Sequence, residues 1–126
     1  MKHTFSRLPA SELQIMQVLW EGHPDMSRLE IQQVIHRKRD LAPTTINSLL
    51  SRLERKGFVS VRKEGKNNLY TPLVEKEEYR SQESRAVLQQ VFDNSLGSFV
   101  SALYDGKKIP RDKLKELEEL VKSLEE

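Results

Sequence analysis

Hydroxyl, amide and guanidinium side chains recur between residues 42 and 56, and no carboxylate appears there before Glu54. At about 100° per residue, these side chains fall on one side of a helix or on its flank. The set consists of Thr44, Thr45, Asn47, Ser48, Ser51, Arg52 and Arg55. Hydroxyls and amides can hydrogen-bond to base edges, and arginine pairs with phosphate or guanine. The pattern predicts a surface that reads nucleic acid, but a solvated amphipathic helix without a partner would have the same polarity.

A basic hairpin is predicted directly after this helix. Val59 and Val61 alternate with polar residues, and a second short run covers residues 69–71. The EGKNN sequence between them contains Gly65 and an Asn-Asn pair and is typical of a turn, and we expect Pro72 to end the second strand or place it on an edge. The cations of the hairpin are Arg62, Lys63 and Lys66. A polar helix followed by a basic hairpin indicates a DNA-reading helix and its wing.

The ends of the polar-faced helix are marked by two residues. Pro43 can occupy the first helical position, and Gly57 can provide a left-handed stop. The opposite face is an apolar stripe of Ile46, Leu49, Leu50 and Leu53. This stripe is expected to hold the helix on a core.

Two more helices are predicted upstream. Ser11 with Gln14, and Ser27 with Glu30, have capping-box spacing. The helices would span residues 11–21 and 27–38, the second with its last turn rich in cations and with Leu29, Ile31, Val34 and Ile35 buried. A short turn at residues 39–42 would follow, and Trp20 would pack the helices together. Three helices followed by a hairpin predict a winged helix-turn-helix domain over residues 1–74.

Residues 75–126 are predicted to form a helical dimerisation region, so the expected fold class is mainly α with a small β-hairpin. Residues 75–103 contain only Gly97 as a helix breaker, DGKKIP interrupts the chain, and a charged helix follows. Two amphipathic helices cannot bury both apolar stripes on each other alone. A second copy of the chain is the simplest partner, and packing against the winged domain is the alternative. The predicted interface residues are Val87, Leu88, Val91, Phe92, Leu96, Phe99, Val100, Leu103, Leu117, Leu120 and Leu124.

Composition narrows the possible functions. Residues 1–74 contain 12 Lys and Arg against 7 Asp and Glu, whereas residues 75–126 contain 9 against 12. There is no cysteine, and His3, His23 and His36 are too scattered to suggest a metal site. We expect no cofactor, and the absence of phosphate-loop, HExxH and nucleophile-elbow motifs argues against an enzyme. Without a signal peptide or an apolar span, a cytoplasmic protein with no direct membrane association is expected.

Three segments resemble the penicillinase-repressor family, which includes the BlaI, MecI and CopY regulators: LPASELQIMQVLW at residues 8–20, APTTINSLLSRLERKGFV at 42–59, and YTPLV at 70–74 followed by Tyr79. The resemblance implies a homodimer that binds a palindromic operator in double-stranded DNA and represses transcription. The third helix would enter the major groove, with Thr44, Thr45, Ser48 and Ser51 nearest the bases. The side chains nearer phosphate would be Arg52, Arg55, Arg62, Lys63 and Lys66.

Family members are released from DNA by different signals, and this chain lacks residues that two of those signals require. In antibiotic-responsive members a membrane-bound sensor protease leads to cleavage at an Asn-Phe bond, which aligns near Ala102-Leu103, where this chain has no asparagine. Copper-responsive members carry paired cysteines, which are absent here, and this excludes copper(I) sensing by thiolates. The rival function is a winged-helix protein-interaction module, which would expose apolar anchors on its third helix.

Overall fold

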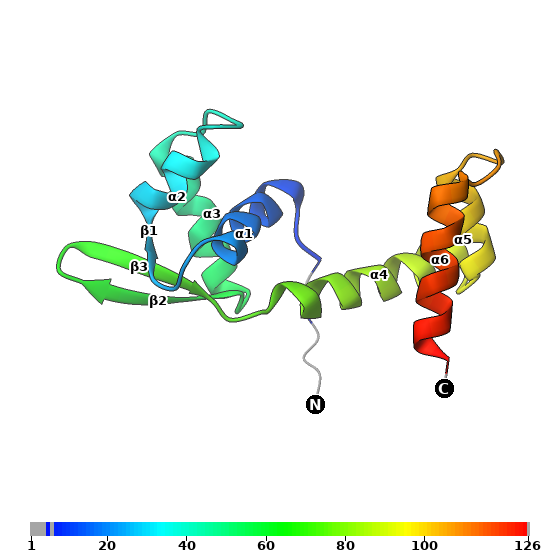
Figure 1. Cartoon of the computed structure of the whole chain (residues 1–126). Helices are drawn as coiled ribbons and strands as arrows, with labels where there is room; N and C mark the ends of the chain where they lie inside the picture. Colours follow the sequence, from blue (N-terminus) through cyan, green and yellow to red (C-terminus); the bar gives the residue numbers. More distant parts are fainter. Residues whose placement is uncertain (1–4, 6, 126) are drawn as a thin grey trace. The chain divides into compact units, whose positions relative to one another are not determined.

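The computed structural model describes residue 5 and residues 7–125, and in these residues it is mainly helical with one small antiparallel sheet (Figure 1). This confirms the predicted fold class. The elements are α1 (Ala10–Glu21), β1 (Met26–Ser27), α2 (Arg28–Ile35), α3 (Pro43–Arg55), β2 (Val59–Glu64), β3 (Asn67–Pro72), α4 (Lys76–Phe92), α5 (Leu96–Leu103) and α6 (Arg111–Leu124).

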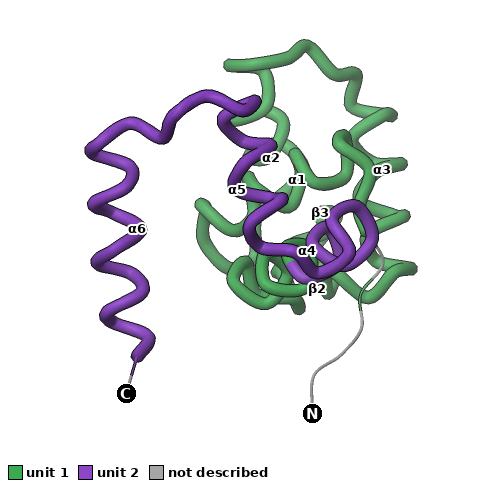
Figure 2. Tube along the Cα trace, turned by 90° about the vertical axis from the view of Figure 1, so that its right-hand side faces the viewer, with its two compact units in different colours: residues 1–84 green, residues 85–126 purple. Residues whose placement is uncertain are grey.

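The chain forms two compact units that divide at residues 84 and 85, within α4 (Figure 2). The first unit contains α1, α2, α3, the sheet and the beginning of α4. The second contains the end of α4 with α5 and α6. The functional boundary expected at residue 74 stays a prediction.

The core of the first unit lies between the three helices and the sheet. Its fully buried side chains include Ile15, Ile31, Ile46, Leu50 and Phe58. Both predicted ends of α3 are confirmed: Pro43 occupies its first turn, and Gly57 has a left-handed φ of 82° two residues after Arg55. Phe58 then donates its N–H to the Leu53 carbonyl at 2.9 Å and places its ring in the core.

The hairpin turns more tightly than expected. Glu64 pairs with Asn67, so the loop has only two residues, Gly65 and Lys66. Gly65 has a φ of 62°, and a glycine in the first loop position is typical of the type II′ turn that suits strand twist. Asn67 and Asn68 therefore belong to β3 and not to the turn. Pro72 ends β3 as predicted.

The predicted two-stranded ribbon is present as β2 and β3, but β1 adds a third strand that the sequence did not predict. The strand order is β1-β3-β2, with Met26 opposite Tyr70 and Ser27 opposite Leu69. A two-residue strand is too short to show alternation, so the sequence gives no period from which to predict it. β3 is the central strand of the sheet.

Helix α1 begins one residue earlier than expected. It starts at Ala10 after Pro9, and no side chain caps it. Ser11 lies inside the first turn, so the predicted capping box of Ser11 and Gln14 is wrong.

Helix α2 begins as predicted and ends early. Ser27 caps it with the complete capping box: its Oγ accepts from the Glu30 N–H at 3.2 Å, and Glu30 Oε1 accepts from the Ser27 N–H at 3.0 Å. It ends at Ile35 and not at Lys38, so the cations of residues 37–39 lie in the following turn and not on the helix. Leu29 was expected in the core, but it is 55% exposed.

Trp20 packs against the core, but its position differs from the predicted one between the helices. Its indole Nε1 donates to the Val74 carbonyl at 2.8 Å, and its ring centroid lies 5.9 Å from that of Tyr79 in α4. Tyr79 is buried, and its hydroxyl accepts from the Leu8 N–H at 2.9 Å. Trp20 therefore joins α1 to the segment after the hairpin, and the first turns of α4 belong to the first unit.

In the second unit the helix breaks where the sequence did not suggest it. Asp93 and Asn94 both adopt left-handed φ values, 48° and 63°, and separate α4 from α5. Aspartate and asparagine tolerate this conformation better than other non-glycine residues. Gly97, the expected breaker, lies inside α5. The interruption at DGKKIP and the charged final helix are confirmed.

Candidate nucleic-acid interface

The outer face of α3 gathers the predicted contact residues. Ile46, Leu49, Leu50 and Leu53 are buried as expected. The exposed side chains are Thr44, Thr45, Asn47, Ser48, Ser51, Arg52 and Arg55. After Pro43, the exposed side of the helix has no apolar anchor of the kind that a protein-interaction surface requires.

A partly buried ion pair joins the end of α3 to α1. Lys56 Nζ donates to Glu12 Oε1 at 2.6 Å, and the Glu12 side chain is only 3% exposed. Among the described residues, Glu12 is the only buried charged group. A carboxylate in this environment requires its partner, because an unpaired buried charge is strongly destabilising. Sequence reasoning missed this pair, although an acidic residue on a largely apolar face of α1 was a signal for it.

The wing carries its cations at the predicted positions. Arg62 and Lys63 lie on β2, Lys66 lies in the turn, and all three are exposed. Within the described part of the chain, only Arg62 of the three forms ion pairs: its Nη2 lies 3.2 Å from Asp25 Oδ2 and 3.0 Å from Glu64 Oε2. These hydrogen bonds raise the pKa of Arg62 above its usual value, with Asp25 as the largest cause.

Asp25 braces the wing on the body of the first unit. Its backbone N–H donates to Thr71 Oγ1 at 2.9 Å, and Thr71 Oγ1 donates to Asp25 Oδ1 at 3.2 Å. The Arg62 hydrogen bond lowers the pKa of Asp25, so this carboxylate is ionised at neutral pH. Asp25 has a left-handed φ of 62°, which aspartate tolerates better than most residues. The sequence offered no periodic signal for this residue, because it acts from an irregular segment.

His23 forms an ion pair with Glu30, which lies in the first turn of α2. His23 Nε2 is 2.7 Å from Glu30 Oε2, and this hydrogen bond is the largest cause that raises the pKa of His23. The pKa of Glu30 is lowered first by the Ser27 backbone N–H and then by His23. In the part of the chain that the structure describes, no three metal-ligating side chains cluster. His3 lies outside that part.

The residues predicted for dimerisation line the second unit and are not buried in it. Val87, Leu88, Phe92, Phe99 and Val100 are half-buried. The exposed ones are Val91, Leu96, Leu103, Leu117, Leu120 and Leu124. Phe92 and Phe99 meet edge to face at 5.3 Å and join the end of α4 to α5.

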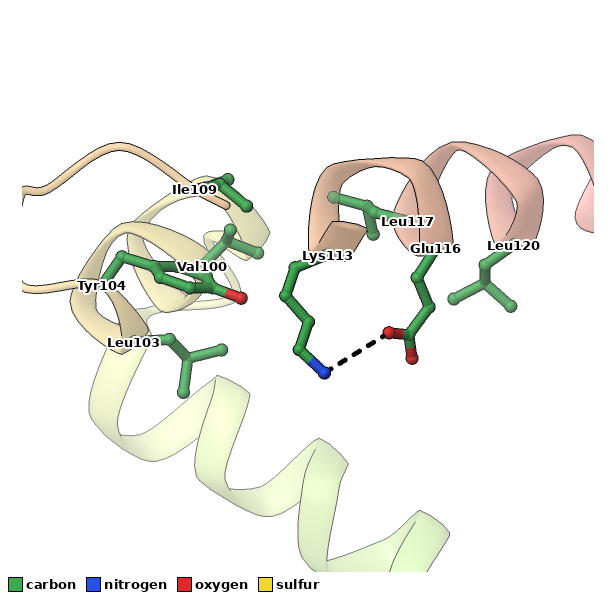
Figure 3. A pocket seen from close by; sticks show the side chains of 8 residues that line it. All are labelled: Val100, Leu103, Tyr104, Ile109, Lys113, Glu116, Leu117 and Leu120. Atoms are coloured by element: carbon green, nitrogen blue, oxygen red, sulfur yellow. Dashed lines mark ion pairs between the residues drawn. The ribbon is translucent and has the colours of Figure 1, made fainter. Parts of the chain in front are cut away.

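An open apolar groove of about 330 Å³ runs between α5 and α6 (Figure 3). Val100 and Leu103 line one wall, and Leu117 and Leu120 line the other. The Lys113–Glu116 ion pair, at 3.7 Å, lies on the α6 side. No residue of α5 or α6 that the structure describes is buried.

Across the described residues, no helix combines the length and apolarity that spanning a bilayer requires.

A three-helix domain with a braced hairpin, whose third helix exposes hydroxyls, an amide and arginines, defines a winged-helix DNA-binding regulator. The chain belongs to the penicillinase repressor family, whose model matches residues 8–123. This membership confirms the resemblance seen in the sequence and the expected class, a transcriptional repressor and not an enzyme.

The relatives match most of the chain. The penicillinase repressor of Bacillus licheniformis is 26% identical over 111 residues, which cover 88% of this chain and 86% of the relative. The methicillin resistance regulatory protein MecI of Mammaliicoccus sciuri is 26% identical over 114 residues, which cover 90% of this chain and 92% of the relative.

Two solved structures of BlaI match a little under two thirds of the chain. The DNA-binding domain of the repressor BlaI is 30% identical with a TM-score of 0.54, and the match covers 63% of this chain and 94% of that domain. The monomeric form of Bacillus licheniformis BlaI in complex with the blaP half-operator is also 30% identical, with a TM-score of 0.52 and the same coverage.

Proposed function

We propose that this protein is a homodimeric transcriptional repressor that binds a palindromic operator in double-stranded DNA. The observation that carries the proposal is the outer face of α3, where seven polar or cationic side chains are exposed beside a basic wing. The BlaI structure with a half-operator supports it, because that protein has the same fold and was solved with half of a binding site. The proposal places the protein in the cytoplasm, with the DNA that it regulates.

The proposed contact residues form two groups, hydroxyl side chains that face the bases and cations that face the phosphate backbone. With α3 in the major groove, Thr44, Thr45, Ser48 and Ser51 face the bases, where short hydroxyls can donate or accept hydrogen bonds. The cations nearer the backbone are Arg52, Arg55, Lys63 and Lys66. Arg62 joins this group only if it exchanges Asp25 and Glu64 for phosphate oxygens.

The second unit supports the dimer. Its apolar side chains remain exposed along α5 and α6 and border an open groove, which is unusual for a stable surface in water. A two-fold axis through this region would present the same patch from both copies. It would also place two α3 helices on half-sites about one DNA turn apart.

Release by a membrane-bound sensor protease is not part of this proposal. In the family, the cleaved Asn-Phe bond aligns near Ala102-Leu103, in the last turn of α5. The chain lacks the asparagine there, so its residues give no support to cleavage with that specificity.

Selection of bound sequences from random DNA duplexes tests the function. We expect a motif of two inverted half-sites from the full-length protein, and two chains per duplex in sedimentation. An interaction module would enrich no sequence, and a single asymmetric site would contradict the dimer.

The base-reading assignment can be tested on the selected duplex. We expect Ser48→Ala or Ser51→Ala to weaken binding to the selected duplex by about 1–3 kcal/mol, the usual contribution of a good base contact. Binding to a random duplex should change little. Equal losses on both duplexes would remove these serines from the base-reading set.

A further inference from the structure

A polar cleft of about 380 Å³ opens in the first unit between the N-terminal residues of α2, the outer face of α3 and the β2–β3 turn. Arg28 and Leu29 contribute from α2, Asn47 from α3, and Lys66 and Asn67 from the turn and β3. Only Asn47 and Lys66 have a role in the interface described so far. The α2 residues of the cleft have none.

The charge of the cleft is positive. Its lining includes the cations Arg28 and Lys66 and no carboxylate. The guanidinium of Arg28 donates to the Gln32 amide oxygen, which is a neutral partner. Neither cation forms an ion pair with any residue that the structure describes, so both charges remain available to an anion.

The uncharged lining indicates what kind of anion fits. The amide side chains of Asn47, Asn67 and Asn68 are exposed and can donate hydrogen bonds to oxygen. Leu29 is 55% exposed at the same cleft and offers an apolar surface. A small inorganic anion would leave this leucine without a contact, whereas a phosphate carried on a sugar would use both kinds of surface.

We propose that this cleft binds the sugar–phosphate backbone of one DNA strand. Arg28 and Lys66 pair with phosphate oxygens, the asparagines donate hydrogen bonds, and Leu29 contacts deoxyribose. The cleft shares Asn47 with α3 and Lys66 with the wing, so the strand runs continuously from one to the other. This inference rests on the proposed DNA binding and adds α2 to it.

The test measures how the affinity of the full-length protein for duplex DNA depends on salt. Fluorescence anisotropy is recorded on the duplex enriched by selection and on a random duplex of equal length. We expect Arg28→Gln to weaken binding to both about tenfold, as for a lost charge-assisted bond. The slope of log K against log salt should become shallower by about one, because one phosphate contact is lost. Arg28→Lys retains the charge and should restore the slope.

Two further variants show whether the change in salt slope comes from the cleft or from loss of any positive charge or contact. Arg80→Gln removes the same charge from α4, outside the cleft, and should leave the slope unchanged. Leu29→Ala should weaken binding to both duplexes severalfold with no change in slope, because a contact to sugar releases no counterions. An unchanged slope in Arg28→Gln would overturn the cleft and leave the proposed function intact. Failure of the unmodified protein to bind either duplex would overturn both.

Discussion

At the scale of single residues, the wing cations are not equivalent. Lys66 is exposed in the turn, whereas Arg62 already pairs with Asp25 and Glu64. A cation whose charge is already balanced by carboxylates adds less to counterion release when it meets phosphate. Equal numbers of positive charges therefore do not mean equal contributions to DNA affinity.

This difference gives a direct prediction. Lys66→Ala should reduce the salt slope of DNA binding by about one on selected and random duplexes alike. Arg62→Ala should reduce it by clearly less. Titration of affinity against salt for the two variants checks the order, and a larger reduction for Arg62→Ala would mean that DNA displaces both carboxylates from Arg62.

The Glu12–Lys56 ion pair predicts that substituting one partner lowers stability. Removing one partner of a fully buried pair costs about 3–5 kcal/mol. Lys56 is 30% exposed, so its charge is partly screened and we expect Lys56→Met to cost about 2 kcal/mol of unfolding free energy. Urea unfolding measures this loss.

The matched control for the pair removes both charges. In Glu12→Leu with Lys56→Met, no charge remains buried without a partner, so the double variant should be more stable than Lys56→Met alone. If the single substitution had no effect, the pair would not contribute to holding α3 in place.

At the scale of elements, two glycines give opposite predictions for substitution by alanine, one because of backbone strain and the other because of helix propensity. Gly57 has a left-handed φ of 82° with open space around its α-carbon, so a side chain there meets no clash but a strained backbone. Gly57→Ala should therefore lower the unfolding free energy by about 1 kcal/mol. Gly97 lies within α5, also with open space around it, so Gly97→Ala should stabilise α5 by about 0.5–1 kcal/mol. Denaturant unfolding followed by circular dichroism measures both variants. No loss of stability in Gly57→Ala would contradict the strain argument, and a loss in Gly97→Ala would contradict the helix-propensity argument.

Periodic segments were predictable from the sequence, and irregular ones were not. The apolar stripe of α3, the Pro43 start and the Gly57 stop were all visible in the sequence, because each is a local consequence of helix geometry. The strand β1 was not visible, since two residues show no period and the strand exists only by pairing with β3. The break at Asp93 and Asn94 was missed because these residues permit a left-handed backbone without requiring it.

The candidate interface was predictable to a similar degree. The exposed face of α3 follows from spacing alone, and the structure places all seven of its residues on the exposed side. The Asp25 brace and the Glu12–Lys56 pair depend on side chains that meet only in the folded domain, so no spacing rule could identify them. Leu29 was expected in the core together with Ile31 and Ile35, but at about 100° per residue it lies on the opposite side of α2 from both, and α2 buries only the latter two.

At the scale of the whole molecule, the exposed apolar surface of the second unit predicts the oligomeric state. Leu120 is 53% exposed and lines the α5–α6 groove. A charge at this position should leave the helix intact and oppose burial against a second copy. We expect Leu120→Asp to be monomeric in sedimentation equilibrium and to bind the selected duplex more weakly.

Lys115→Gln is the control for this variant. It changes the net charge by the same amount on the opposite side of α6 and should remain dimeric. Leu120 is a better position than Phe99 for testing dimerisation. Phe99 packs on Phe92 within the unit, so its substitution would also disturb that packing. A dimeric Leu120→Asp would move the interface away from the groove.

The division of α3 into a buried and an exposed face has a consequence for how new members of the family can arise. Ile46, Leu49, Leu50 and Leu53 hold the helix in the core, while Thr44, Ser48 and Ser51 are exposed. Surface substitutions of this kind usually change stability by no more than about 0.5 kcal/mol. With the proposed base contacts at these positions, a duplicated copy could acquire a different target sequence through a few surface substitutions, with the core unchanged.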